Sequence, residues 1–429
     1  MASGKEKKQI FALGLDDFNR SQLEALSSAV NYDFHEALPT ERLKTYRERS
    51  IDSTLEEIRE SLKDRQVDGL ITWWDFPCTM LLGKLNDDLG FEGLTLEHAL
   101  RCEHKYWSRC LQAEVIPEAV PGFDVVNPFD AKAFEDLDLS TPFWLKPIKG
   151  TESMLSFRIE TAEDYQQALE AACESIRELA RPVNEILSHA ELPEEIAHVD
   201  GSYCQLETEC AGSQHTVCGY VAKGEIRTYG VVDSLNYPDS TSFLCYAYPS
   251  ELPESIQSRM IELSRKVIGH LGLEQSAFNI EYFYNEPKDE INLLEINPRI
   301  SQSHSNIFYK VDGKSDEALI IELALGEAPD FPEGRGDYDC AAKYYLRTFE
   351  DGRVERTPTP EETRAIQEAF PGLLVHLEVE EGQRLSDMLE HDSYSYVLAT
   401  CFLGAEDRKQ LKRKFDAVAE RLDFHIERD

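Results

Sequence analysis

The sequence predicts a mixed α/β and α+β protein, and three observations lead to that fold class. The chain has 429 residues, of which 41% are apolar, so it is long enough for two or three domains with packed cores. Strands and helices alternate over roughly the first hundred residues, whereas strands dominate from about residue 335. We therefore expect an α/β domain at residues 1–104, a central domain at 105–330 and a β-rich α+β domain at 331–429.

The first domain is expected to contain a small parallel sheet. Strands are predicted at residues 9–15 and 67–74, and helices at residues 20–30, 53–66 and 77–90. This alternation is typical of parallel strands that are connected by crossover helices. No G-x-G-x-x-G turn follows a strand, so an NAD site is not expected.

The second predicted strand ends in Trp73, Trp74 and Asp75. Open α/β sheets often bind ligands beyond the ends of their strands, so this position is a candidate binding site. At least one of the two tryptophans is expected to pack in the core instead.

The central and C-terminal regions alternate between strands and amphipathic helices. The central elements are a helix that reaches Glu114, two strands within 143–159, a helix at 162–180, strands at 202–210 and 215–226, a helix at 253–273, and a hairpin of residues 276–284 and 291–296. Residues 231–243 are read as a polar turn. The C-terminal elements are a hairpin around Asp351-Gly352, strands at 373–382 and 395–404, and a charged helix at 406–422.

Composition excludes several classes of partner. The net charge is −37, and binding to nucleic acid or to anionic lipid requires basic surface. No run approaches the roughly 20 apolar residues of a spanning helix, and the short apolar run near the N-terminus does not resemble a secretory signal. The ten cysteines are scattered, which suits a reducing compartment. A cytoplasmic protein that binds neither membranes nor nucleic acid is expected.

The stretch "INLLEINPR" places polar side chains at alternate positions behind an apolar run. Residues i and i+2 of a strand share a face, so Glu295 and Asn297 point together, and Arg299 joins them if the strand continues past Pro298. Glu281 lies on the other strand of the predicted hairpin. Unpaired buried carboxylates are costly, whereas a divalent cation prefers oxygen ligands. The pattern favours a magnesium site, and the alternative is a hairpin whose polar face is simply solvated.

Two further positions are candidates for nucleotide contacts. Lys146 closes a buried strand before a loop that contains Gly150 and Ser153, and from there it could deliver a charge to a phosphate. The alternative is a lysine that extends to solvent from a strand end. Glu207 lies in an extended segment, "QLETECAG", whose backbone could bind a purine edge. An ordinary transition from strand to loop would give the same pattern.

In this order, the segments "HK", "LKPIKGTESMLSFRI", "QLETECAG", "FNIEYFY" and "LLEINPR" resemble the ATP-grasp superfamily from about Lys105 to Arg299. The resemblance implies an ATP-grasp fold with an N-terminal α/β pre-ATP-grasp domain and a C-terminal β-rich domain like that of biotin carboxylase. It also implies ATP as co-substrate and Mg²⁺, or Mn²⁺ in its place, as the metal.

Carried over by motif, the resemblance assigns a role to each site residue. Lys105 and Lys146 would contact the ATP phosphates, with Ser153 in the loop that covers them. The segment that meets adenine and ribose would comprise Glu207, Thr208, Glu209 and Cys210. The metal ligands would be Glu281, Glu295 and Asn297, and Arg299 would steady the anionic substrate and its acyl phosphate.

Two departures from the family pattern bear on the reaction. The phosphate-covering loop keeps only Gly150, with Glu152 and Leu155 where small residues are common, so Ser153 would carry more of the phosphate contact. Biotin carboxylases carry a glutamate just before the histidine of this motif, to deprotonate bicarbonate, whereas this chain has Ser303 before His304. A serine cannot serve as that base at neutral pH.

His304 has two readings of equal weight. It could bind substrate or carry a proton beside Arg299, since histidine is easily tuned near neutral pH. It could also be a loop residue with a structural hydrogen bond.

The resemblance implies an ADP-forming carbon–nitrogen ligase that activates a small-molecule carboxylate as an acyl phosphate and joins it to an amine, in a bond of the amino-acid or peptide type. Two alternatives stay open at this point: a biotin-carboxylase-like enzyme that makes carboxyphosphate, and an ATP-binding regulatory protein without turnover. A homodimer is one assembly that the resemblance allows.

Overall fold

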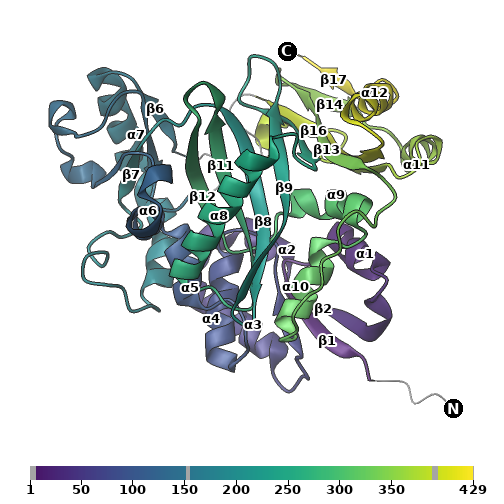
Figure 1. Cartoon of the computed structure of the whole chain (residues 1–429), viewed down its shortest axis with the longest axis horizontal. Helices are drawn as coiled ribbons and strands as arrows, with labels where there is room; N and C mark the ends of the chain where they lie inside the picture. The colour runs from purple at the N-terminus through teal and green to yellow at the C-terminus, as the bar shows by residue number, and fades with distance from the viewer. Residues whose placement is uncertain (1–5, 151–154, 389–394, 429) are drawn as a thin grey trace.

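Four β-sheets organise the computed structural model, which describes residues 6–150, 155–388 and 395–428. An eight-stranded antiparallel sheet runs through the centre. A four-stranded sheet with α7 (Ala162–Leu187) lies to one side of it, and the C-terminal elements lie on the other side (Figure 1). Among the described residues, no helix combines the length and the apolar character that crossing a membrane would require.

The predicted parallel sheet of the N-terminal region is confirmed. Its strands follow the order β2-β1-β3 and both neighbours run parallel to β1. The strands are β1 (Lys8–Leu13), β2 (Tyr32–Leu38), which was not predicted, and β3 (Gly69–Ile71). The helices are α1 (Asp17–Ala25), α2 (Thr40–Lys44), α3 (Ile51–Leu62), α4 (Cys78–Leu89) and α5 (Leu96–Glu103). Helix α1 ends at Ala25 rather than at residue 30.

The four-stranded sheet has the antiparallel order β4-β7-β5-β6. Its strands are β4 (Phe123–Val126), β5 (Phe143–Pro147), β6 (Phe157–Ile159) and β7 (Cys204–Thr208). The two predicted strands within 143–159 are confirmed as β5 and β6. Helix α7 packs against this sheet and starts with a capping box, in which Thr161 and Asp164 satisfy each other's backbone N–H groups.

The eight-stranded sheet has the order β12-β11-β8-β9-β10-β13-β16-β15. Its strands are β8 (Ser213–Ala222), β9 (Glu225–Asn236), β10 (Phe243–Tyr248), β11 (Ser276–Asn285), β12 (Glu290–Asn297), β13 (Cys340–Thr348), β15 (Leu374–Leu377) and β16 (Tyr396–Ala405). Helix α8 (Glu254–Leu271) covers one face. The predicted hairpin is confirmed as β11 and β12. The reading of residues 231–243 as a polar turn is correct only for residues 237–242, because β9 continues to Asn236 and β10 begins at Phe243.

The predicted hairpin around Asp351-Gly352 is also wrong. Strand β13 pairs with β10 and β16, whereas β14 (Arg353–Arg356) pairs with β17 (His425–Glu427). The first residues of β13 are buried, and a strand inside a sheet must satisfy the backbone groups on both of its edges. Two helices, α11 (Pro360–Ala369) and α12 (Arg408–Ala419), complete this region. The predicted boundary near residue 330 falls before β13, yet the central sheet runs across it.

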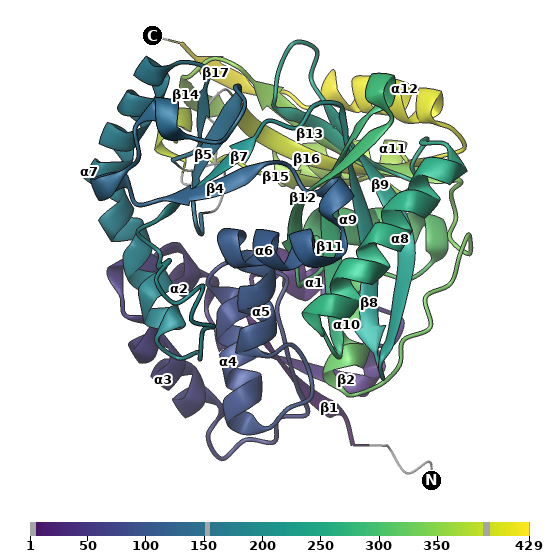
Figure 2. The ribbon, with the colours of Figure 1, turned by 60° about the vertical axis from the view of Figure 1, so that its left-hand side comes forward.

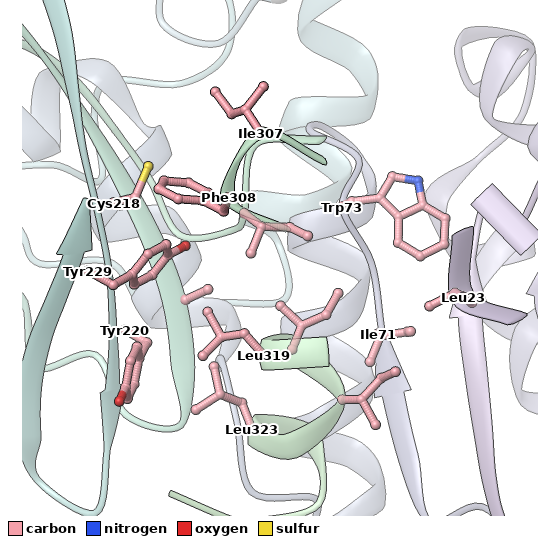
Figure 3. Close-up of a cluster of buried hydrophobic side chains, with 14 of the residues drawn as sticks. Leu23, Ile71, Trp73, Cys218, Tyr220, Tyr229, Ile307, Phe308, Leu319 and Leu323 are labelled. Carbon is pink, nitrogen blue, oxygen red and sulfur yellow. The ribbon is translucent and has the colours of Figure 1, made fainter. Parts of the chain in front are cut away.

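One hydrophobic core joins the N-terminal sheet to the central sheet. Helices α9 (Gln302–Asp312) and α10 (Asp316–Ala324) lie between them, as Figure 3 shows. Buried side chains from all three layers meet there: Leu23, Ile71, Trp73, Cys218, Tyr220, Tyr229, Ile307, Phe308, Leu319 and Leu323. Trp73 is 2% exposed, so it takes the expected core role. This core fixes the end of β3, and therefore Asp75, relative to β12.

Candidate functional site

The predicted metal ligands come together on two paired strands. Glu281 on β11 lies directly opposite Glu295 on β12, and Asn279 lies opposite Asn297. The amide of Asn297 donates to Oδ1 of Asn279 at 3.2 Å and to Oε1 of Glu295 at 3.3 Å. Gln214 on β8 donates to Oε2 of Glu281 at 2.6 Å. The antiparallel register therefore gathers two carboxylates and an amide oxygen on one face of the sheet.

The charge of Glu295 disfavours ionisation of Glu281. Burial, together with the charge of Glu295, raises the pKa of Glu281 to about 8. A divalent cation placed between them would remove that repulsion, and oxygen ligands suit Mg²⁺. No group of three or more His, Cys, Asp or Glu side chains able to hold a metal occurs in the described part of the chain. A metal at this pair would need further oxygens from a ligand such as a phosphate.

Arg299 extends this face and joins it to the N-terminal domain. Its Nη2 lies 3.4 Å from Oδ1 of Asn297 and 3.1 Å from Oδ2 of Asp75. Burial opposes ionisation of Asp75, but the charges of Lys149 and Arg299 outweigh burial and hold the pKa of Asp75 below its ordinary value. Asp75 is therefore ionised at neutral pH. The loop after β3 contributes a carboxylate to the site, at the position where an open sheet is expected to bind ligands.

Lys149 and Glu103 complete this ion network. Nζ of Lys149 lies 2.8 Å from Oδ1 of Asp75 and 2.9 Å from Oε2 of Glu103, which ends α5. Although burial favours the neutral amine, the two carboxylates raise the pKa of Lys149. Neither Lys149 nor Glu103 was predicted as a site residue. A weak signal was available in "LKPIKG", which places a second lysine three residues after Lys146.

One predicted phosphate-binding lysine, Lys105, lies close to the predicted metal ligand Glu295. Lys105 is the first residue of α6 (Lys105–Val115), where the side chain of His104 caps the helix by accepting from the N–H of Trp107 at 3.2 Å. Burial lowers the pKa of Lys105, Glu295 acts in the opposite direction, and Lys149 and Lys146 lower it further. Cationic side chains from three segments therefore converge near Glu295, and such a cluster in an acidic protein suits a polyanion.

The side chain of Glu207, predicted to contact the nucleotide, pairs with cationic side chains of the protein. It lies on β7 with a side chain that is 3% exposed. Its Oε2 lies 2.8 Å from Nη2 of Arg109, and its Oε1 lies 3.4 Å from Nζ of Lys146. Burial would raise its pKa, but the charges of Arg109 and Lys146 lower it instead. This carboxylate is occupied by protein cations, and its proposed contact with a nucleotide stays a prediction.

Arg109, which was not predicted as a site residue, connects Glu207 on β7 to β12. Besides Glu207, its Nη2 donates to the backbone oxygen of Leu294 on β12 at 2.6 Å. It therefore ties the four-stranded sheet to the strand of the metal ligands. Figure 2 shows α6, which carries it, between these two parts. No distinctive pattern marks it, because an arginine in an amphipathic helix is common.

The remaining residues of the predicted adenine-binding segment, Thr208 and Glu209, are held by backbone hydrogen bonds. The N–H of Thr208 donates to the oxygen of Gly122 at 2.8 Å, and the N–H of Glu209 donates to that of Pro142 at 3.1 Å. The side chain of Glu209 pairs with Arg158 at 2.6 Å. Burial raises the pKa of the Cys210 thiol to about 11, so this thiol is neutral. Ser153, predicted to contact phosphate, lies outside the described residues.

His304 packs inside the protein and is 2% exposed. Its Nδ1 lies 3.5 Å from Sγ of Cys218, and its ring meets that of Tyr246 at 5.0 Å. Burial, joined by the charges of Lys343 and Arg299, lowers the pKa of His304 to about 3. The neutral imidazole beside Cys218 supports the structural reading of this residue, and its proton-carrying role stays a prediction.

The comparisons with known proteins identify the same region. Residues 139–306 match the family model of the ATP-grasp domain. The L-amino acid ligase from Bacillus licheniformis is similar over 99% of this chain and 100% of its own, with 15% identity and a TM-score of 0.70. The carboxyaminoimidazole ribonucleotide synthase from Aspergillus clavatus, complexed with ATP, covers 97% and 99%, with 16% identity and a TM-score of 0.66. A biotin carboxylase from Campylobacter jejuni covers 98% and 93%, with 14% identity and a TM-score of 0.63.

Proposed function

This chain belongs to the ATP-grasp superfamily, and from that premise we propose that it is an ADP-forming carbon–nitrogen ligase that uses Mg-ATP, or Mn-ATP, to join a small carboxylate to an amine. An oxygen of the carboxylate attacks the γ-phosphorus of ATP, and the bond from that phosphorus to the ADP oxygen breaks. The amine nitrogen then attacks the carbon of the acyl phosphate. Phosphate leaves with the bonding electrons and the nitrogen loses a proton, which gives an amide.

One observation carries this proposal: the opposed pair Glu281 and Glu295, with Asn297 at the end of the same strand and Arg299 just beyond that end. Burial and the charge of Glu295 raise the pKa of Glu281 to about 8, and a cation between the two carboxylates would remove that repulsion. A metal bound there would neutralise the charge that develops on the transferred phosphoryl group. Only two carboxylates are offered, which suits a metal that shares its remaining positions with phosphate and water.

The cations around this pair support the remaining roles. Lys105 and Lys146 would hold the phosphates, because both lie close enough to Glu295 or Glu207 to interact electrostatically. Arg299 would hold the donor carboxylate and its acyl phosphate, since its guanidinium projects between Asn297 and Asp75. Positioning and electrostatics would supply most of the catalysis, as in other phosphoryl transfers.

The surroundings of Ser303 disfavour the carboxylase alternative. Its Oγ lies 3.2 Å from Nζ of Lys343 and 3.3 Å from the hydroxyl of Tyr345. A hydroxyl beside an ammonium group is a still weaker base than a free serine, so it could not deprotonate bicarbonate.

The test is ADP release with Mg²⁺ and ATP in the presence of paired carboxylates and amines drawn from the common amino acids. The proposal expects release that requires an amine and yields a product with a new amide bond, detected by mass spectrometry. Release that requires bicarbonate and no amine would overturn it in favour of the carboxylase. Tight ATP binding without release under any pairing would make the protein a regulatory binder.

A further inference from the structure

A cluster of polar and aromatic side chains lies next to Arg299 but takes no part in the roles above. It is defined here as the acceptor cluster and comprises Ser303 at the start of α9, Lys343 and Tyr345 on β13, and Tyr246 on β10. All four side chains are partly exposed. The C-terminal region therefore places a lysine beside the strands of the central site, because β13 pairs directly with β10.

Lys343 has an unusual environment for a lysine in a protein of net charge −37. Its Nζ lies 3.2 Å from Oγ of Ser303, 4.9 Å from the centre of the Tyr345 ring and 5.4 Å from that of Phe402. Within the described ranges it has no ion-pair partner, although acidic side chains outnumber basic ones by 81 to 44. An ammonium group held between a hydroxyl and aromatic faces remains ready to bind an anion.

Ring contacts place this cluster beside His304, which follows Ser303 in the sequence. The Tyr246 ring lies 5.0 Å from that of His304 and 5.9 Å from that of Tyr345. Lys343 and Arg299 both act electrostatically on His304, so the buried imidazole lies near both cations. Arg299 also lies beside Asn297 of the predicted metal site. Lys343 is therefore available to a different group of the substrates.

We propose that Lys343 and Ser303 bind the carboxylate of the amine acceptor, so that the acceptor is an amino acid rather than a simple amine. This inference rests on the proposed ligase function. Arg299 would hold the donor's activated carboxylate, while Lys343 would hold the acceptor's own carboxylate on the other side of His304. Tyr246 and Tyr345 would contact the acceptor's carbon skeleton. The hydroxyl of Ser303 and the ammonium of Lys343 both donate, which matches a carboxylate acceptor of hydrogen bonds.

The test compares each amino acid with its carboxamide, which keeps the amine and removes the negative charge. Wild-type protein should use the amino acid with a kcat/KM about 10- to 100-fold higher than that of the carboxamide, the range expected for one hydrogen bond to a charged group. Lys343→Gln should raise KM for the amino acid, so that its kcat/KM falls to the level of the carboxamide. The same variant should leave kcat/KM for the carboxamide and the Kd of ATP unchanged. Lys343→Arg, which keeps the positive charge, should retain most of the preference for the amino acid over the carboxamide. Lys409→Gln, at an exposed lysine on α12, is the matched control and should change nothing.

A second measurement needs no turnover. With Mg²⁺ and a non-hydrolysable ATP analogue, an amino acid should raise the melting temperature of wild-type protein more than its carboxamide does, and Lys343→Gln and Ser303→Ala should remove that difference. If wild type shows this difference but releases no ADP, the ligase function fails and the carboxylate subsite stands. If amine-dependent ADP release is present but Lys343→Gln keeps the preference, the subsite fails and the ligase function stands. Equal losses with both acceptors would make Lys343 structural and would overturn the inference.

Discussion

Arg299 and Asp75 form an ion pair of 3.1 Å although they lie 224 residues apart in the sequence. The pair joins the loop after β3 to the end of the strand that carries Glu295 and Asn297. Lys149 binds the other oxygen of Asp75 at 2.8 Å. The N-terminal domain therefore supplies the counter-charge for two cations of the central site, and a bound anionic substrate would compete with Asp75 for Arg299.

Replacement of Asp75 tests this arrangement. Asp75→Asn should destabilise the protein by about 2 kcal/mol, within the range for hydrogen bonds to charged groups, because Arg299 loses its only ion-pair partner among the described residues. Lys149 would retain Glu103. Urea unfolding measures the change. Asp33→Asn, which removes an exposed pair with Lys7, is the control and should change stability far less, because exposed ion pairs contribute little. Equal effects would show that Asp75 does not hold the domains together.

Replacing one carboxylate of the predicted metal site should reduce catalysis without reducing stability. Glu295→Gln should lower Mg²⁺-dependent turnover more than about 100-fold, since even residues behind metal ligands contribute 10- to 100-fold to metal affinity. The metal-free melting temperature should stay the same or rise, because the repulsion on Glu281 disappears. Steady-state ADP release and calorimetry measure the two effects. Glu290→Gln, at an exposed position on the same strand, should retain activity. A large loss of stability in Glu295→Gln would mean that the residue is structural.

The raised pKa of Glu281 predicts a pH dependence of stability. Its pKa rises from 4.5 to about 8 on folding, so the folded protein binds more protons than the unfolded chain between these values. Its contribution is therefore fully present below pH 4.5 and is lost as the pH rises through about 8. Mg²⁺ should accordingly raise the melting temperature more at pH 8 than at pH 6. Calorimetry with and without Mg²⁺ checks this, and the pH-dependent part of the Mg²⁺ effect should vanish in Glu281→Gln.

Replacing Lys146 should weaken nucleotide binding more than it lowers the stability of the fold. Lys146→Ala should weaken Mg-ATP binding at least about tenfold, equivalent to about 1.4 kcal/mol, because a cation near the phosphates is lost. Glu207 keeps Arg109 as its partner, so the protein should stay folded. Isothermal titration gives the Kd. Lys132→Ala removes an exposed lysine that pairs with Asp124 on β4 of the same sheet, and it should bind ATP normally. An unchanged Kd in Lys146→Ala would refute the assigned phosphate contact.

The buried pair of Arg109 and Glu207 should be structural. Arg109→Met should cost about 3–5 kcal/mol of stability, because among the described residues it leaves the buried carboxylate of Glu207 with Lys146 as its one cation, besides a hydrogen bond from Gln205. The double variant with Glu207→Gln should recover part of that loss, since the stranded charge is gone. A double-mutant cycle by urea unfolding measures the coupling. Additive losses would show that the two side chains do not stabilise each other.

The local pattern was enough to place the predicted metal ligands on one face of a hairpin. Alternation along a strand puts Glu295 and Asn297 on one face whatever the rest of the fold does, and the polar turn after residue 284 made the hairpin with Glu281 predictable. The β11–β12 pairing, the parallel N-terminal sheet and strands β5 and β6 follow from patterns within a few tens of residues. The errors arose where partners are distant: β13 looked like half of a hairpin, but its neighbours are β10 and β16.

By itself, the sequence determined which residues share a strand face and which family pattern they follow. Only the tertiary structure decided which charges neutralise one another: Asp75 with Arg299 and Lys149, Glu207 with Arg109, and Lys343 with no acid among the described residues. The physical reason is that periodicity is a property of neighbouring residues, whereas an ion pair depends on how separate sheets pack. That packing is set by a hydrophobic core drawn from α1, β3, β8, β9, α9 and α10, which no single segment of the chain reveals.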